Sequence, residues 1–202
     1  ALEVLRKKKL MHLDIKPSNI LYNADNEPKL TDFGIAKKEG DPRDREGLMG
    51  TPYYIAPERV AEHWQDWRSD MYSLAATLYH AATGQEPYDL PSVEETVWAH
   101  VKVKLTPPRK ICKELSKDIN NAICTAMEKD PNKRFKSYDE FSMALEAARS
   151  RLLVNRYRNS IRYVDALVGE ILEIYRDELA RDELVVVVTG DHGEEFWEHG
   201  LF

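Results

Sequence analysis

Four polar residues near the start of the chain have the types and the spacing that phosphoryl transfer requires. Asp14, Lys16 and Asn19 lie within six residues, and Asp32 follows a short predicted hairpin. Transfer of a γ-phosphoryl group needs a carboxylate that orients the acceptor hydroxyl and takes its proton, a lysine that neutralises the phosphate, and oxygen ligands for magnesium. The hairpin is expected to bring Asp32 alongside the other three side chains. The stretch therefore supplies every residue type that this chemistry needs.

The sequence around these residues resembles two consecutive loops of protein kinases, the catalytic loop and the metal-binding loop. The matching runs are His12-Leu-Asp-Ile-Lys-Pro-Ser-Asn19 and Asp32-Phe-Gly34. Lysine two positions after the aspartate is the serine/threonine-kinase form of the loop. The resemblance implies ATP as the donor, a protein as the acceptor, Asp14 as the catalytic base, Lys16 at the γ-phosphate, and Asn19 and Asp32 as magnesium ligands.

A second run, Gly50-Thr51-Pro-Tyr-Tyr-Ile-Ala56-Pro57-Glu58, matches the same family further along the chain. The resemblance implies that Thr51 contacts the catalytic aspartate and lysine. It also implies a buried ion pair between Glu58 and Arg134, and an Asp70 that anchors the catalytic loop from a central helix. The ion pair is expected to be structural, because removing one partner leaves a buried charge uncompensated.

The sequence departs from the family pattern in its activation loop. Leu13 stands where many kinases have the arginine that receives an activation-loop phosphate, and residues 32–50 contain no Ser, Thr or Tyr. These two observations agree, so we expect no switching of this loop by its own phosphorylation. A larger departure is that no glycine-rich loop, strand lysine or partner glutamate is found. We expect the complete protein to have an N-terminal lobe, and the 202 residues alone to bind ATP poorly.

The periodicity of the sequence predicts a mainly α (α+β) fold. Short strands are predicted at 20–22 and 29–31, and an exposed loop at 39–52. Helices are predicted from about Asp70 to Gly84 and over 93–101, 117–127 and 137–149, the last beginning with a capping box at Ser137. We assign residues 1–150 to a kinase C-terminal lobe that lacks its N-terminal lobe.

A different kind of segment occupies residues 151–202. A long amphipathic helix is predicted over 157–179, followed by a β-branched strand at 184–188 that ends in polar residues. The segment resembles the C-terminal part of a sulfatase of the alkaline-phosphatase superfamily, a helix–strand fragment of an α/β hydrolase-type sheet. The resemblance implies a divalent metal, Ca²⁺ or Zn²⁺, with Asp191 and His192 as ligands and His199 as a ligand or substrate contact. The nucleophile motif and the upstream acidic ligands are absent from this sequence.

Composition excludes several classes of protein. Charged residues make up 32% of the chain and its net charge is −6, which argues against a nucleic-acid partner. No apolar run approaches the ~20 residues that cross a bilayer, and no signal peptide is visible. Cys112 and Cys124 have no metal or disulfide spacing, so buried free thiols and a cytoplasmic location are expected.

Three functional hypotheses remain open. The first is a protein serine/threonine kinase that uses ATP and Mg²⁺, inactive as this fragment alone. The second is a metal-dependent sulfatase or phosphoesterase, represented by residues 151–202. The third is a truncated or fused protein in which neither site works. Residue coverage favours the kinase.

Overall fold

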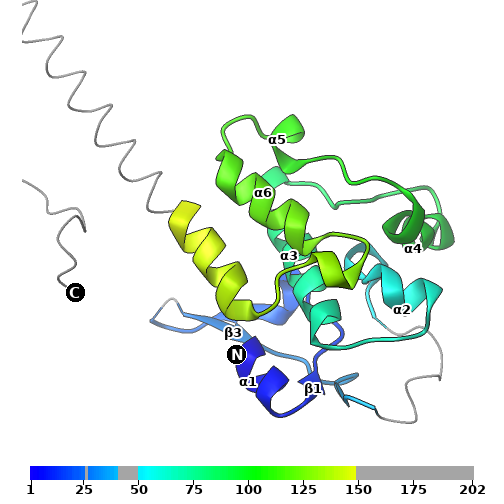
Figure 1. Ribbon diagram of the computed structural model, residues 1–202, viewed down its shortest axis with the longest axis vertical. Helices are drawn as coiled ribbons and strands as arrows, with labels where there is room; N and C mark the ends of the chain where they lie inside the picture. The colour runs from blue at the N-terminus through cyan, green and yellow to red at the C-terminus, as the bar shows by residue number, and fades with distance from the viewer. Residues whose placement is uncertain (26, 41–49, 149–202) are drawn as a thin grey trace, which may run out of the picture. The chain divides into compact units, whose positions relative to one another are not determined.

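The computed structural model describes residues 1–25, 27–40 and 50–148 (Figure 1). The chain divides after Ala148 into two units, of which only the first, Ala1–Ala148, is described. A helix over residues 138–148 ends this unit. In chain order, the elements before it are α1 (Leu2–Lys7), β1 (Leu10–Met11), η1 (Pro17–Asn19), β2 (Ile20–Tyr22), β3 (Pro28–Leu30), β4 (Lys37–Lys38), η3 (Pro52–Tyr54), α2 (Pro57–Ala61), α3 (Trp67–Thr83), α4 (Val93–Lys102), α5 (Pro108–Ile111), α6 (Lys117–Ala126) and η4 (Pro131–Lys133).

Helix α3 is the centre of this mainly helical unit, with α6 packed alongside it (Figure 1). Its carboxyl end is where the sequence predicts it, because Gly84 caps the helix in the left-handed conformation with φ 73°. Its amino end lies three residues before the predicted one, since the Asp66 side chain accepts a hydrogen bond from the Arg68 amide and caps the first turn. Apolar side chains from α3, from α6 with the residue that follows it, and from residues 138–148 make up most of the core: Met71, Tyr72, Ala75, Ala76, Tyr79, Ala122, Ile123, Ala126, Met127 and Phe141.

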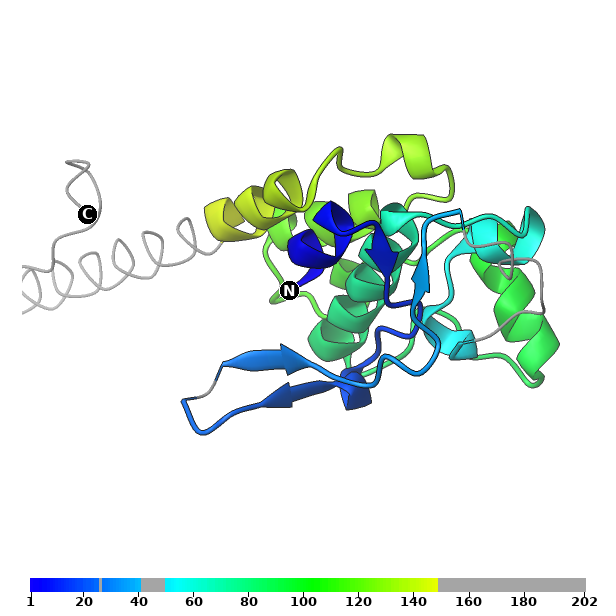
Figure 2. The ribbon, with the colours of Figure 1, turned by 90° about the horizontal axis from the view of Figure 1, so that it is seen from below.

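Two small antiparallel sheets complete the secondary structure of the described residues. Strands β2 and β3 form the predicted hairpin, with Ile20 opposite Leu30, although β3 begins and ends one residue earlier than predicted. This hairpin projects from the helical body (Figure 2). The second sheet pairs β1 with β4 and was not predicted, since two-residue strands give too short an alternation to recognise.

Serine side chains cap α4, α6 and the helix over residues 138–148. Helix α4 has a capping box of Ser92 and Glu95, and Ser116 caps α6. Both helices differ from the predicted bounds by one residue. The predicted capping box at residues 137–140 is right for the Ser137 side chain, which accepts from the Glu140 amide at 3.0 Å. The Glu140 carboxylate instead accepts from the Lys136 amide at 2.8 Å.

Several predictions concern residues outside the described part. These are most of the loop over 39–52, the helix over 157–179, the strand at 184–188, and the metal ligands Asp191, His192 and His199. In the part that the structure describes, no helix has the length and apolar character to cross a membrane. Cys112 and Cys124 are free thiols, but both are half-buried rather than fully buried as expected.

Candidate active site

The loop that carries Asp14 is anchored to helix α3 by one buried carboxylate. Asp70 accepts from the His12 amide at 2.7 Å and from the Leu13 amide at 2.8 Å, one with each oxygen. Burial raises the pKa of Asp70, while the two amide hydrogen bonds oppose the shift. Leu13 is held in the left-handed region with φ 68°, which non-glycine residues seldom adopt. The loop geometry immediately before Asp14 is therefore imposed by α3.

Asp14, Lys16 and Thr51 form a closed set of contacts. The Lys16 ammonium lies 2.8 Å from Asp14 Oδ2 and donates to the Thr51 hydroxyl at 3.0 Å. That hydroxyl donates to Asp14 Oδ1 at 2.7 Å, and the Thr51 amide donates to the same oxygen at 3.0 Å. Two side chains, from segments up to 37 residues away in sequence, thus converge on the carboxylate of Asp14. The sequence placed these three residues together, and the structure brings them into contact.

These contacts determine the charge state of Asp14. Burial alone raises the pKa of its carboxyl group, but the hydrogen bonds from Lys16 and Thr51 and the charge of Lys16 outweigh burial and lower the pKa below its ordinary value of 3.8. Asp14 is consequently ionised at neutral pH. A carboxylate in this state can accept a hydrogen bond from a substrate hydroxyl and orient it.

Asn19 lies beside this set with its amide orientation fixed. Its Nδ2 donates to the Asp14 carbonyl oxygen at 2.8 Å and to Asp14 Oδ2 at 3.2 Å. Both acceptors require the nitrogen on that side, so the amide oxygen faces the other way. No described residue donates to this oxygen. Since Mg²⁺ is bound by amide and carboxylate oxygens together with substrate phosphates, the orientation of Asn19 fits a magnesium ligand.

Asp32 is connected to Asn19 through its neighbour Thr31. The Thr31 amide donates to the Asn19 carbonyl oxygen at 2.9 Å, and Asp32 follows as the second residue after the β2–β3 hairpin. The carbonyl oxygen of Thr31 is 2.9 Å from His12 Nε2, and the Phe33 ring packs edge-on against His12 at 4.7 Å. His12 thus holds both neighbours of the exposed Asp32. Sequence reasoning assigned no role to His12, although its place in the quoted motif was a signal.

The expected Glu58–Arg134 ion pair is present and buried. Ser69 also donates to Glu58 Oε1 at 2.7 Å, a contact that no local sequence pattern indicated. The guanidinium donates further to the backbone oxygens of Arg68 and Glu128, both at 2.9 Å. Every polar group of the pair has a partner, so the pair can remain charged in the interior.

The magnesium ligands would be few. Among residues 1–25, 27–40 and 50–148, no three His, Cys, Asp or Glu side chains gather as a metal cluster. Asp32 and Asn19 offer one carboxylate and one amide, which suits an ion that keeps waters and binds substrate phosphates rather than an all-protein cage.

The comparison with protein families agrees with this geometry. The family model of the protein kinase domain matches residues 1–150. The chain belongs to the protein kinase domain family. The probable serine/threonine-protein kinase CPE1738 of Clostridium perfringens is 36% identical over 148 residues, which are 72% of this chain and 22% of that protein. The serine/threonine-protein kinase PknB of Mycobacterium tuberculosis is 29% identical over 195 residues, covering 91% of this chain and 31% of that protein. The chain thus spans between a fifth and a third of the length of these relatives.

A second family model, that of the sulfatases, matches residues 119–201. Its match overlaps that of the kinase model from 119 to 150. Within this overlap, Ile123 and Phe141 are buried in the core around α3, and Arg134 forms the ion pair with Glu58. The described part of the overlap therefore folds as part of the kinase-family unit.

Proposed function

We propose that residues 1–150 are the C-terminal lobe of a protein serine/threonine kinase, which transfers the γ-phosphoryl group of ATP to a hydroxyl group of a protein. The observation that carries the proposal is the closed contact of Asp14, Lys16 and Thr51. It supports the reaction because an ionised carboxylate, a cation and a hydroxyl meet at one point, beside the Asn19 amide, whose oxygen faces away from Asp14.

Each residue has one role in this proposal. Asp14 orients the acceptor hydroxyl and takes its proton as the new O–P bond forms and the bond from the γ-phosphorus to the departing ADP oxygen breaks. Lys16 neutralises charge on the transferred phosphoryl group, and Thr51 holds the other two side chains in position. Asn19 and Asp32 hold Mg²⁺, which supplies positive charge to the phosphates when bound.

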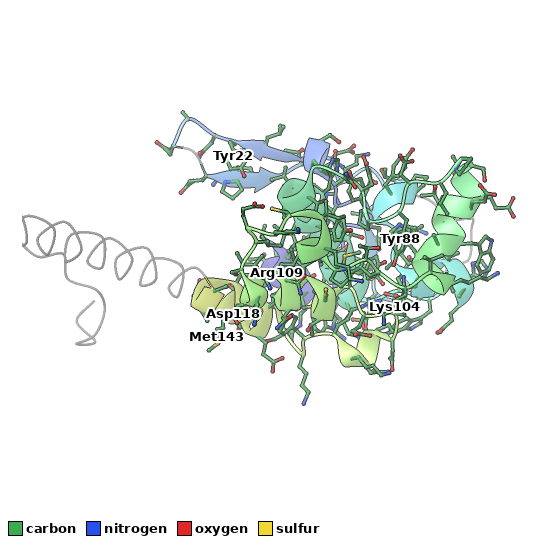
Figure 3. All side chains as sticks on the ribbon, turned by 90° about the horizontal axis from the view of Figure 1, so that it is seen from above. Tyr22, Tyr88, Lys104, Arg109, Asp118 and Met143 are labelled. Carbon is green, nitrogen blue, oxygen red and sulfur yellow. The ribbon has the colours of Figure 1, made fainter. Side chains whose placement is uncertain are left out.

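The exposed apolar side chains beside the site support an N-terminal lobe in the complete protein. Leu21, Tyr22 and Phe33 are 55%, 66% and 49% exposed; the first two lie in β2, shortly after Asn19, and Phe33 directly follows Asp32. Tyr22 lies on the hairpin, away from the helices that carry Arg109 and Met143 (Figure 3). Exposed apolar side chains next to a site are consistent with a surface that a ligand or another domain covers. In our proposal the N-terminal lobe and the nucleotide cover it.

The substrate and compartment follow from the same proposal. A protein hydroxyl is the acceptor, no nucleic acid takes part, and the cytoplasm provides the ATP. Residues 151–202 form a separate segment with a sulfatase-like sequence. The match of the sulfatase family model favours a second candidate function there, a metal-dependent ester hydrolase with Asp191, His192 and His199 around a divalent ion.

Two assays on one sample test the proposal against this alternative. The chain is joined at Ala1 to the part of the Clostridium perfringens relative that precedes its matched segment. The product is tested for Mg²⁺-dependent phosphate transfer from ATP to a basic protein and for hydrolysis of nitrophenyl sulfate and nitrophenyl phosphate. Transfer without hydrolysis is the expected result. Hydrolysis that requires Asp191 and His192, without transfer, would establish the alternative.

A further inference from the structure

Arg59, in the short helix α2, has a buried guanidinium that none of the roles above uses. Its Nη1 donates to the backbone carbonyl oxygen of Leu13 at 2.8 Å, across 46 residues of sequence. Its Nε donates to Gln65 Oε1 at 3.0 Å. Only 6% of Arg59 is exposed. A charged side chain is buried to this degree only when it has partners, so the contact with Leu13 is a specific one.

Leu13 is the residue whose conformation determines where Asp14 points. Its amide is held by Asp70 and its carbonyl oxygen by Arg59, so it is fixed from both sides. It is buried as well as left-handed. Backbone in this region persists only where the surroundings impose it. Asp14 is the next residue, and the peptide plane that Arg59 contacts is the one that joins it to Leu13.

Gly50 connects this contact to Thr51. Its φ of 120° is one that side-chain-bearing residues rarely adopt, and a Cβ atom there would lie 3.0 Å from the Leu13 carbonyl oxygen and 3.2 Å from Arg59 Nη1. The segment that enters Thr51 therefore lies directly against the Arg59–Leu13 hydrogen bond. The catalytic loop, α2 and the Gly50–Thr51 segment meet at this one place.

The charge of Arg59 also has a counterpart. Asp70 is 1% exposed, and the positive charge of Arg59 is among the groups that favour its ionised form. The resemblance to kinases leads one to expect an arginine at position 13, where this chain has leucine. Leu13 has no charge, whereas the positive charge of Arg59 reaches the loop from helix α2.

We propose that Arg59 is a positioning residue for Asp14: it fixes the Leu13 carbonyl group and thereby aligns Asp14 with Thr51. Residue 13 itself carries no charge, and Arg59 supplies a positive charge beside it from α2. This inference rests on the proposed kinase function for its kinetic consequence, but its structural part does not.

The structural part is tested on the 202-residue chain by hydrogen exchange of individual amides. Arg59→Met keeps an unbranched side chain and removes the hydrogen bonds and the charge, and Arg59→Lys keeps the charge alone. Arg68→Met is the matched control, because Arg68 is a partly buried arginine that bonds Asp66 and Asn132 without contact to Leu13. We expect Arg59→Met to speed exchange of the Leu13 and Thr51 amides at least about tenfold, since local opening becomes easier. Arg59→Lys should give a smaller change, and neither variant should change the amides of α6.

Unchanged exchange at Leu13 and Thr51 in a folded Arg59→Met chain would overturn the proposal. If that variant does not fold, Arg59→Lys and Gly50→Ala are used to test the proposal instead. The added methyl group of Gly50→Ala crowds both atoms of the same hydrogen bond. Both variants should therefore speed amide exchange at Leu13 and Thr51 selectively. Unchanged exchange at these two amides in both variants would equally overturn it.

The kinetic part uses the chain joined to an N-terminal lobe. Misplacement of a catalytic group by a fraction of an ångström lowers the rate of the chemical step. Arg59→Met should therefore reduce kcat by roughly 10- to 100-fold and leave the KM for ATP unchanged. A kcat equal to that of the parent would overturn the positioning role. If the parent itself transfers no phosphate while the exchange results hold, the proposed function fails and the structural role of Arg59 stands.

Discussion

Arg134 binds both carboxylate oxygens of Glu58, from which it is separated by 76 residues. Nη1 is 2.8 Å from Oε1 and Nη2 is 2.7 Å from Oε2, and the two side chains are almost completely buried. The pair joins helix α2 to the segment after α6. Helix α2 comes shortly after Thr51 in the sequence, and Arg134 comes directly after η4. The stability of the unit should therefore depend on this contact more than on any surface ion pair.

The first prediction concerns this ion pair. Arg134→Ala should lower the free energy of unfolding by about 3–5 kcal/mol, because Glu58 is left buried without its counter-charge. Thermal or denaturant unfolding of the 202-residue chain measures the change. Lys29→Ala, which breaks the exposed pair with Glu27, is the control and should leave unfolding nearly unchanged. Equal melting temperatures of Arg134→Ala and the parent would contradict the claim that this ion pair stabilises the fold.

The second prediction separates the hydroxyl group of Thr51 from its shape. Thr51→Val removes the hydrogen bonds that the hydroxyl makes with Asp14 and Lys16, but keeps the volume and the backbone amide that donates to Asp14, whereas Thr51→Ser keeps the hydroxyl. In the chain joined to an N-terminal lobe, Thr51→Val should lower kcat by roughly 10- to 100-fold, since Asp14 is less well oriented. Thr51→Ser should retain most of the activity. Steady-state kinetics would contradict the assigned role if the valine variant were as active as the serine variant.

The third prediction is a pH dependence that arises from His100. Burial, followed by the positive charge of Lys129, lowers the pKa of His100 to about 3. Its ordinary pKa is 6.5, so between these values the unfolded chain binds one proton more than the folded chain. The stability contributed by neutral His100 is complete above pH 6.5 and falls as the pH decreases, by about 1.4 kcal/mol per pH unit from this residue.

Urea unfolding at pH 7, 6 and 5 measures this slope. His100→Asn should flatten it, because asparagine does not titrate and offers Tyr72 an acceptor near the position of Nδ1. The control is His63→Asn, at an exposed residue with φ 50° that asparagine tolerates, and this variant should keep the parent slope. A slope that His100→Asn leaves intact would show that other groups cause the acid sensitivity.

The fourth prediction concerns regulation. Residues 32–50 contain no hydroxyl group, so any phosphate that the active protein acquires should map elsewhere. Mass spectrometry of the protein after incubation with ATP and Mg²⁺ locates the phosphate. A phosphate on Thr51 that raised activity would contradict both the regulation proposed here and the role of its hydroxyl group as a contact of Asp14.

Much of the site could be predicted because its residues are close in sequence or belong to a recognisable run. The spacing of Asp14, Lys16 and Asn19, the glycine that ends α3 and the β2–β3 hairpin are all local features. The kinase-like sequence also led us to expect the contacts of Asp70 and the pair of Glu58 with Arg134.

The contacts that were missed are long-range and lack a local pattern. Nothing around Arg59 indicates that it reaches Leu13, and nothing around Ser69 indicates a bond to Glu58. Such contacts depend on how α2 and α3 pack, which periodicity does not encode. The left-handed conformations of Leu13 and Asp32 are likewise imposed by the surrounding structure, since neither residue is a glycine.

The most direct test of the central claim is phosphate transfer by the chain joined to an N-terminal lobe, with radiolabelled ATP and a basic protein as acceptor. Asp14→Asn keeps the size of the side chain and removes its charge, and Asp89→Asn makes the same change at an exposed residue remote in sequence from the site. We predict Mg²⁺-dependent transfer by the parent and by Asp89→Asn, and a loss of roughly 100-fold or more in Asp14→Asn. Transfer that Asp14→Asn sustains at the parent rate would contradict the claim that this carboxylate performs the chemistry.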